Sequence, residues 1–464
     1  MKHLTKYMPR TLSVLLTFVL CLGSLGLMTG CSRENGEPCG TPEDGGIPLD
    51  EGTTPDPTPE PPETNPDPSQ PDQTLEWVMR TGMELTPDLD SINSAISDTS
   101  MELVRRSLAK PAAAGESAMI SPFSILTAFA MAQEGAAGIT AEEMEAVFGW
   151  NADEISSWLA SWNQSLSEKN VTKMNVANSF WYRQGSFQPA EDYLNTLETA
   201  YDAQLRPSAF DDAAAAEINR WCEEETHGMI PQVVDRVDAD VEAILLNAIA
   251  FEGKWKKAYD DYQVTEGEIF TAEDGTESAV TMLASEESTY LEAEGVTGFV
   301  KPYTDGYSFV ALLPEEGASA ADLVSRMDGN LFRNLLAGAR HAQVRAWIPE
   351  FKSEYNADKM KETLQEMGLV TIFDPGAADL SDMGHTDAGT SLYVSQVIHK
   401  TFIDLNREGT RAAAVTGLVT KATSAGPAEL PYYEVRLDRP FVYVIMDDFS
   451  QTPLFAGVMM NVEG

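Results

Sequence analysis

A stretch of nearly continuous apolar sequence, AILLNAIAF from Ala243 to Phe251, constrains the fold of this chain more than any other feature. A second apolar run extends from Ser308 to Leu313 and ends at Pro314. Runs without regular polar alternation are typical of strands that are covered on both faces of a sheet. We therefore expect a central sheet with other elements packed on both of its sides.

Helical periodicity is clear in the part of the chain that precedes these runs. Apolar residues recur at helical spacing from Leu89 to Val104 and predict one helix. The segment Pro122–Phe129 predicts another helix, with Ser121 as its N-cap. Thr140 and Glu143 have the spacing of a capping box and predict the start of a third helix.

Further strand patterns follow near the end of the chain. Phe441–Met446 and Leu454–Met460 are predicted strands, joined by a turn-like segment. Helices come mostly first and strands mostly second, which favours an α+β fold. Residues 76–464 contain no second proline-rich linker and no repeat, so we expect them to form a single large domain.

The first thirty residues have the pattern of a targeting segment. Basic residues precede an apolar run from Leu12 to Leu22, and small residues follow up to Cys31. The stretch LMTGC at 27–31 resembles a bacterial lipobox, in which Cys31 would be lipidated as the first residue of the mature protein. We predict that residues 1–30 are a lipoprotein signal peptide outside the fold, with an uncleaved membrane anchor as the alternative.

The next segment, residues 31–75, has a different composition. It contains eleven prolines between positions 38 and 71, interleaved with Asp, Glu, Thr and Gly. Such a segment cannot bury a core, and it predicts a disordered, extended tether on the order of 100 Å long. The expected location is therefore lipid-anchored at a bacterial outer membrane, on the cell surface, with the periplasmic face as the alternative.

Charge and motif content exclude several classes of function. The chain has 31 Lys and Arg against 73 Asp and Glu, a net charge of −42, which makes nucleic acid an unexpected partner. Its five histidines lack zinc-site spacing, and we expect neither a metal nor a cofactor. We found no Gly-x-Ser-x-Gly, His-Glu-x-x-His, Cys-x-x-Cys or phosphate-binding glycine motif. A non-consensus catalytic triad remains a rival hypothesis.

Two residues with reactive side chains are predicted to be structural. Cys222 lies in a helical pattern with no catalytic motif around it, so we expect a buried apolar residue. His399 lies in the alternating segment Leu392–Phe402, where we expect a buried, hydrogen-bonded imidazole.

The segment at residues 403–424, IDLNREGTRAAAVTGLVTKATS, has too much Thr, Val and Gly for a helix and too little bulk for a core strand. Counting by twos places Arg411 and Lys421 on one face of an extended chain. The opposite face is uncharged and mostly small: Thr410, Ala412, Ala414, Thr416, Leu418 and Thr420. The pattern fits a loop that can become a strand in an existing sheet, with Gly409 as a hinge, although an ordinary loop or strand would show this sorting about half the time by chance.

At this segment the sequence resembles the serpin family. NREGTRAAA at 406–414 is similar to the hinge of an inhibitory serpin's reactive loop. DRPF at 438–441 and LFAGV at 454–458 resemble the C-terminal signature of the family. Further matches occur in family order: SPFSI at 121–125, INRW at 218–221, THGMI at 226–230, NAIAFEGKW at 247–255 and PEFK at 349–352. Together the matches span residues 87–462.

The resemblance implies a serpin fold, in which helices of the N-terminal half pack on a large central sheet, with further smaller sheets and an exposed reactive-centre loop at about 407–431. It also implies a monomeric suicide-substrate inhibitor rather than an enzyme, with serine proteases as the main targets and cysteine proteases as a second class. Cleavage of the loop would let it insert as a new central strand and carry the covalently attached protease across the domain.

The resemblance assigns the reactive-site bond to Thr423–Ser424, because the specificity residue in the family commonly lies fourteen positions after the hinge glycine. Thr423 suits an elastase-like protease. Lys421–Ala422 is a secondary site that suits a trypsin-like protease. The hinge residues are Glu408, Gly409, Thr410, Ala412, Ala413 and Ala414.

Other family positions are implied to control the opening of the sheet. Ser121, Ser124, Asn247 and His399 match a polar cluster beneath it, and Trp255 matches the tryptophan where insertion begins.

The chain departs from the family pattern at two positions. Arg407 and Arg411 stand where acidic residues are usual, and both are predicted to face solvent. The alanine-rich hinge favours an inhibitor over the alternative, a non-inhibitory serpin that acts as a binding or carrier module.

Overall fold

The computed structural model describes residues 14–24, 87–166, 173–228, 230–409 and 430–462, and the following account concerns these residues. The helices are α2 (Pro87–Ala113), α3 (Pro122–Gln133), α4 (Gly138–Phe148), α5 (Ala152–Leu166), α6 (Glu191–Tyr201), α7 (Ala214–Glu225), α8 (Ala320–Arg326), α9 (Gly329–Ala337) and α10 (Met360–Glu366), with 3-10 helices η1 (Asp261–Gln263) and η2 (Thr371–Phe373). Within the described ranges, no helix has the length and apolar character needed to cross a membrane.

Helix α3 begins as its sequence predicts. Ser121 is extended and its side chain accepts a hydrogen bond from the Ser124 N–H, while Pro122 occupies the first helical position. Every residue of α3 is buried, which explains its lack of a polar face.

The capping box predicted at Thr140 and Glu143 is wrong. Helix α4 begins earlier, with Ala137 as an N-cap that makes no side-chain hydrogen bond. The Glu143 carboxylate instead accepts hydrogen bonds from the main-chain N–H groups of Val370 and Thr371, 2.6 Å from each. Distant main-chain donors therefore take the carboxylate that the local pattern assigned to the helix start.

Six strands form the central sheet: in spatial order, β12 (Phe351–Asn356), β14 (Leu392–Leu405), β1 (Val14–Ser24), β6 (Val241–Glu252), β3 (Lys173–Arg183) and β5 (Ala203–Ser208). Neighbours are antiparallel except for β3 and β5, which are parallel. The predicted apolar run at 243–251 forms most of β6, so its assignment to a central strand is confirmed.

A second sheet has nine strands. Its order is β15 (Tyr432–Arg436), β11 (Arg340–Pro349), β8 (Glu277–Ala293), β9 (Val296–Pro302), β10 (Tyr307–Pro314), β16 (Phe441–Asp447), β17 (Pro453–Met459) and β2 (Ala118–Ile120), and β7 (Val264–Thr271) pairs with β8. A two-stranded sheet joins β13 (Gly384–Thr386) to β4 (Phe187–Pro189). The predicted α+β class and large central sheet are confirmed, as are the strands predicted at 308–313, 441–446 and 454–460.

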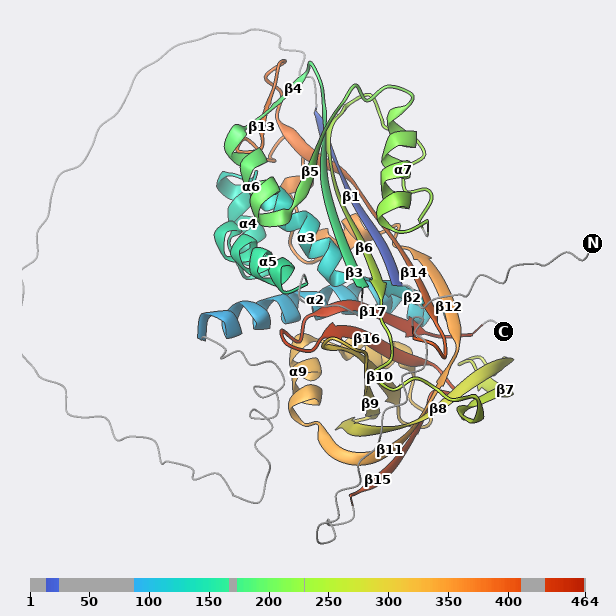
Figure 1. Cartoon of the computed structure of the whole chain (residues 1–464). Helices are drawn as coiled ribbons and strands as arrows, with labels where there is room; N and C mark the ends of the chain where they lie inside the picture. The colour runs from blue at the N-terminus through green and yellow to red at the C-terminus, as the bar shows by residue number, and fades with distance from the viewer. Residues whose placement is uncertain (1–13, 25–86, 167–172, 229, 410–429, 463–464) are drawn as a thin grey trace, which may run out of the picture. The chain divides into compact units, whose positions relative to one another are not determined.

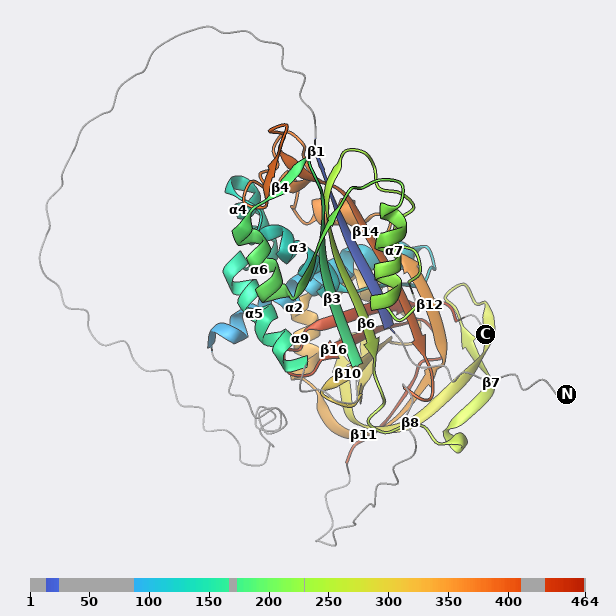
Figure 2. The same cartoon turned by 45° about the horizontal axis from the view of Figure 1, so that its top comes forward.

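Both faces of the central sheet are covered. Helix α7 packs on one face, where Ile218 and Trp221 share a buried cluster with Ile244 and Leu246 of β6. Helix α3 packs against β6 and β1 from the other side (Figures 1 and 2). Residues of β6 therefore alternate between two cores, which explains why the strand is apolar on both faces.

Val14–Ser24 fall within residues 1–30, the predicted signal peptide, and in the full chain they lie in the central sheet; the signal peptide itself stays a prediction. These residues form β1, which pairs along its length with β14 on one side and β6 on the other. Leu20, whose side chain is described, is fully buried. A strand that is covered on both faces of a sheet needs apolar residues without polar alternation. A targeting segment has the same composition, so composition alone does not distinguish the two.

Candidate functional site

The predicted reactive loop leaves the central sheet at the end of β14. Strand β14 ends at Leu405, and Asn406–Gly409 form a turn that we call the stem. The Gly409 N–H donates to the Asn406 main-chain oxygen at 3.3 Å, and the Glu408 N–H donates to Asn406 Oδ1 at 3.0 Å. These two contacts hold the stem as a turn rather than as a continuation of the strand.

Gly409, the predicted hinge glycine, is buried against Trp255. Its φ is +49°, a conformation that favours glycine. A Cβ atom at this position would lie 2.4 Å from the Trp255 main-chain nitrogen and 2.8 Å from Trp255 Cδ1. Both the backbone conformation and the lack of space therefore require glycine.

Trp255 also contacts the other end of the stem. Its indole Nε1 donates a hydrogen bond to the Asn406 main-chain oxygen at 3.1 Å. The indole stacks on the Tyr303 ring, with 4.2 Å between ring centroids and 8° between planes. Trp255, which the resemblance placed where insertion begins, thus contacts both the first and the last residue of the stem.

Arg407 does not simply face solvent as predicted. Its main-chain N–H donates to Glu350 Oε1 at 2.9 Å, and its side-chain Nε lies 3.3 Å from the same oxygen. The side chains are 38% and 24% exposed, so water partly screens this pair. Glu350 lies between β11 and β12, and its carboxylate binds the stem at Arg407.

The four polar residues predicted beneath the sheet come together in one network, which we call the gate cluster (Ser121, Ser124, Asn247 and His399). The Ser121 N–H donates to His399 Nε2 at 3.1 Å, and the Ser124 hydroxyl donates to Asn247 Oδ1. All four residues are fully buried. The start of α3 is therefore bonded to both β14 and β6.

The sequence analysis missed one member of this network, Asn178 on β3. Asn178 lies directly opposite Asn247 in the sheet register, and its Oδ1 accepts a hydrogen bond from Asn247 Nδ2 at 2.7 Å. Its own Nδ2 donates to the Tyr201 main-chain oxygen at 2.7 Å. A polar residue close to apolar ones, with Val176 and Ala177 before it and Phe180 and Trp181 after it, was the available signal.

His399 is neutral in this environment. Its Nε2 accepts the Ser121 N–H, so the ring proton is placed on Nδ1. Burial lowers the pKa of His399 to about 3, because the charged imidazolium would lose its hydration. The prediction of a buried, hydrogen-bonded imidazole is confirmed.

Strand β1 occupies the space between the two strands that the gate cluster joins. In the register, Phe18 of β1 pairs with Asn247 of β6 on one side and with His399 of β14 on the other. We call this position between β6 and β14 the slot. It accepts a strand that runs antiparallel to both neighbours, beside the strand from which the predicted loop emerges.

Several predicted site residues lie outside the described residues, and the structure places none of them: Cys31, Thr410, Arg411, Ala412, Ala413, Ala414, Lys421, Ala422, Thr423 and Ser424. Of the predicted hinge, Glu408 is exposed and Gly409 is buried. Cys222 is buried, as predicted.

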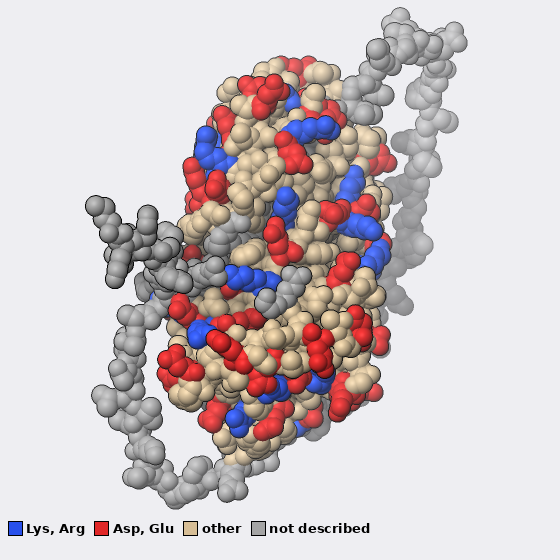
Figure 3. Space-filling view, turned by 90° about the vertical axis from the view of Figure 1, so that its right-hand side faces the viewer, with Lys and Arg blue, Asp and Glu red and all other residues tan. Residues whose placement is uncertain are grey.

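The chemistry of the site is that of packing and hydrogen bonding. Among residues with described positions, no group of three or more His, Cys, Asp or Glu side chains is arranged to hold a metal ion. On the face shown in Figure 3, basic side chains are interspersed with acidic ones. The contacts described above hold the stem, β6 and β14 in place. Such contacts can be broken without a chemical reaction, so the site is suited to a conformational change.

Comparison with known proteins identifies relatives of this architecture. The family model described as Serpin (serine protease inhibitor) matches residues 94–462. An uncharacterized serpin-like protein of Thermococcus kodakarensis is 31% identical over 396 residues, covering 83% of this chain and 88% of the relative. The leukocyte elastase inhibitor of Xenopus tropicalis is 30% identical over 388 residues, covering 80% and 99%. The crystal structure of the thermophilic serpin tengpin in the native state matches with a TM-score of 0.72 and 34% identity, covering 82% of this chain and 96% of that one.

Proposed function

The chain belongs to the serpin family of protease inhibitors, and from this premise we propose that it inhibits serine proteases as a suicide substrate. The protease serine attacks the Thr423 carbonyl, an ester forms, and the Ser424 amine leaves with a proton. Insertion of the cleaved loop then traps the ester before water hydrolyses it. Lys421–Ala422 is the proposed secondary bond, and cysteine proteases are a second class of target.

The observation that carries this proposal is the slot. The central sheet accepts an eleven-residue strand between β6 and β14, with backbone pairing on both sides. The proposed loop follows β14 after a four-residue stem, so a chain that turns back at Gly409 enters the slot in the same antiparallel direction as β1. The fourteen residues from Thr410 to Thr423 would span about 46 Å as a strand.

The same observation supports a proposal about which form of the protein is the inhibitor. Because β1 fills the slot, the loop can insert only when Val14–Ser24 are absent from the sheet. We propose that removal of residues 1–30 as a lipoprotein leader empties the slot, leaves Cys31 lipidated, and places the domain on its tether at the bacterial cell surface. The inhibitory form is thus the processed form.

The driving force in the proposal is the difference between an empty and a filled slot. An inserted loop gains ladder hydrogen bonds on both edges, as β1 does in the precursor, and buries its own small face. Before cleavage, the contacts of the stem and the gate cluster oppose insertion. The processed form then persists because insertion is slow, and not because its conformation has the lowest free energy.

Two features support the choice of target. Thr423 is small and β-branched, which suits an elastase-like specificity pocket. The similarity to a leukocyte elastase inhibitor agrees with this class. The Lys421 ammonium suits the acidic pocket of a trypsin-like protease, but cleavage there shortens the inserted strand by two residues and should trap less efficiently.

Incubation of the processed protein with elastase-like and trypsin-like proteases tests the proposal on a denaturing gel. A covalent band near the summed mass supports inhibition, and mass spectrometry of the released peptide identifies the bond. Nicking of the loop without a complex supports the carrier alternative. Turnover of an added substrate by the protein alone supports a hidden catalytic triad. Either of the last two results contradicts the proposed function.

A further inference from the structure

The second sheet contains a buried ion pair close to the Trp255 ring. Lys301 Nζ on β9 is 2.8 Å from Glu287 Oε1 on β8, and the two side chains are 1% and 8% exposed. The Ser285 hydroxyl donates to the same carboxylate oxygen at 2.6 Å. Desolvating two charges opposes folding, and apolar side chains would fill such a position at less cost. The retention of charge here therefore calls for a role beyond packing.

The cation of this pair lies against aromatic rings. Lys301 Nζ is 5.1 Å from the centroid of the Trp255 ring and 4.4 Å from that of Tyr259. Burial lowers the pKa of Lys301, and the adjacent Glu287 carboxylate opposes that shift. A desolvated cation attracts the faces of aromatic rings strongly, so Lys301 contributes to the position of the Trp255 indole.

The same indole holds the stem. Trp255 Nε1 donates to the Asn406 main-chain oxygen, and Gly409 packs directly on the Trp255 backbone and ring. A continuous set of contacts therefore runs from Glu287 through Lys301 and Trp255 to the stem. Any change in the position of the indole alters both of its contacts with the stem.

We propose that Lys301 and Glu287 are positioning residues for Trp255 and that they set the rate at which the stem is released into the slot. This inference rests on the proposed function, since it concerns the timing of loop insertion. The pair acts through the indole.

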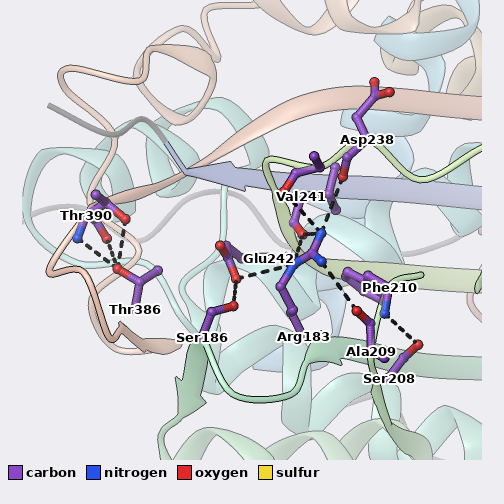
Figure 4. Close-up of polar contacts among 11 residues, drawn as sticks. Arg183, Ser186, Ser208, Ala209, Phe210, Asp238, Val241, Glu242, Thr386 and Thr390 are labelled. Carbon is purple, nitrogen blue, oxygen red and sulfur yellow. Dashed lines mark hydrogen bonds and ion pairs between the residues drawn. The ribbon is translucent and has the colours of Figure 1, made fainter. Parts of the chain in front are cut away.

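The far end of the central sheet offers a matched control. Glu242, near the start of β6, accepts a hydrogen bond from the Ser186 hydroxyl at 2.5 Å and lies 3.7 Å from Arg183 Nε (Figure 4). The Arg183 and Glu242 side chains are 17% and 12% exposed. Glu242 thus shares a serine donor, a cation and partial burial with Glu287, but it lies at the end of β6 opposite the stem.

The test compares Glu287→Gln with Glu242→Gln in the processed protein. Each variant is held at 37 °C without protease, and the remaining capacity to form covalent complex with an elastase-like protease is measured over time. We expect Glu287→Gln to shorten the half-life by about tenfold, as a buried cation–π contact is weakened. We expect Glu242→Gln to change the half-life by less than about twofold, although both lower the unfolding midpoint.

Two further variants separate positioning from general loss of stability. In a Trp255→Phe background, Glu287→Gln should leave the half-life unchanged, because the indole contact is already lost. The double variant Glu287→Gln/Lys301→Met contains no unpaired buried charge, yet it should still lose capacity quickly because the cation is gone. It also provides a soluble alternative if the single variant does not fold.

Three outcomes overturn the inference. These are equal half-lives for Glu287→Gln and Glu242→Gln, a full effect of Glu287→Gln in the Trp255→Phe background, and wild-type behaviour of the double variant. Each of these can occur while the wild-type processed protein forms its complex. Absence of any complex from the wild-type protein contradicts the proposed function instead.

Discussion

The indole of Trp255 donates a hydrogen bond to the main-chain oxygen of Asn406, 151 positions further along the chain. The bond joins the residue that follows β6 to the turn that follows β14, the two strands that border the slot. It therefore closes the slot at the end where the proposed loop would begin to insert. Under the proposed function, release of the stem would require this bond to break.

The first prediction concerns Gly409→Ala. We expect it to destabilise the native state by about 1–3 kcal/mol, because the new Cβ overlaps the Trp255 backbone and the backbone conformation is left-handed. Gly185→Ala is the control, since Gly185 has a φ of +86° and open space around it. Urea unfolding of the processed protein should show a clearly larger loss for Gly409→Ala. Equal losses of unfolding free energy in the two variants would mean that the overlap with Trp255 does not contribute to the destabilisation.

A second prediction separates the two bonds that Glu350 makes to Arg407. Arg407→Ala removes only the partly exposed ion pair and should cost less than about 1 kcal/mol. Glu350→Ala also leaves the Arg407 main-chain N–H without its acceptor and should cost more. The midpoint of urea unfolding distinguishes the two, and a larger effect of Arg407→Ala would contradict this reading.

The third prediction concerns pH. The pKa of His399 is lowered by burial to about 3 from an unfolded value near 6.5, so the unfolded state binds more protons between these values. The contribution to stability is therefore complete above pH 6.5 and is lost as pH falls, by about 2 kcal/mol at pH 5. His399→Gln should flatten this dependence in urea unfolding measured from pH 7.5 to 5. An unchanged slope in the variant would assign the pH effect to other groups.

A fourth prediction tests the competition between β1 and the loop. The full chain with residues 1–30 intact should form little covalent complex with an elastase-like protease, because its slot is filled. Leu20→Asp in the full chain should restore trapping, since a buried charge at this fully enclosed position expels β1. The same complex yield from the full chain, its Leu20→Asp variant and the processed protein would show that β1 does not compete.

The fifth prediction concerns specificity. Lys421→Ala should abolish cleavage by trypsin-like proteases after residue 421 and leave the elastase-like complex intact. Thr423→Asp should have the opposite pattern, because an acidic side chain is rejected by an apolar specificity pocket. Mass spectrometry of the released peptide checks both, and an unchanged cleavage position in Thr423→Asp would place the reactive bond elsewhere.

Much of the fold follows from local sequence. The apolar run at 243–251 and the Ser121–Pro122 start of α3 were predictable, because strand burial and helix capping depend on residues near one another in the chain. The glycine requirement at position 409 also had a local signal, although the reason for it, contact with Trp255, did not. Resemblance of motifs supplied the gate cluster, which composition and periodicity alone would have left as four separate polar residues.

Tertiary structure alone decided where several groups found their partners. Glu143 bonds to the backbone of Val370 and Thr371 instead of its own helix start, and Arg407 finds Glu350 instead of solvent. The sequence determined which segments are able to be strands; the fold determined that Val14–Ser24 is the one that fills the slot. The physical reason is that hydrogen bonds and burial are satisfied by whichever group the folded chain brings within reach, and sequence distance does not enter that competition.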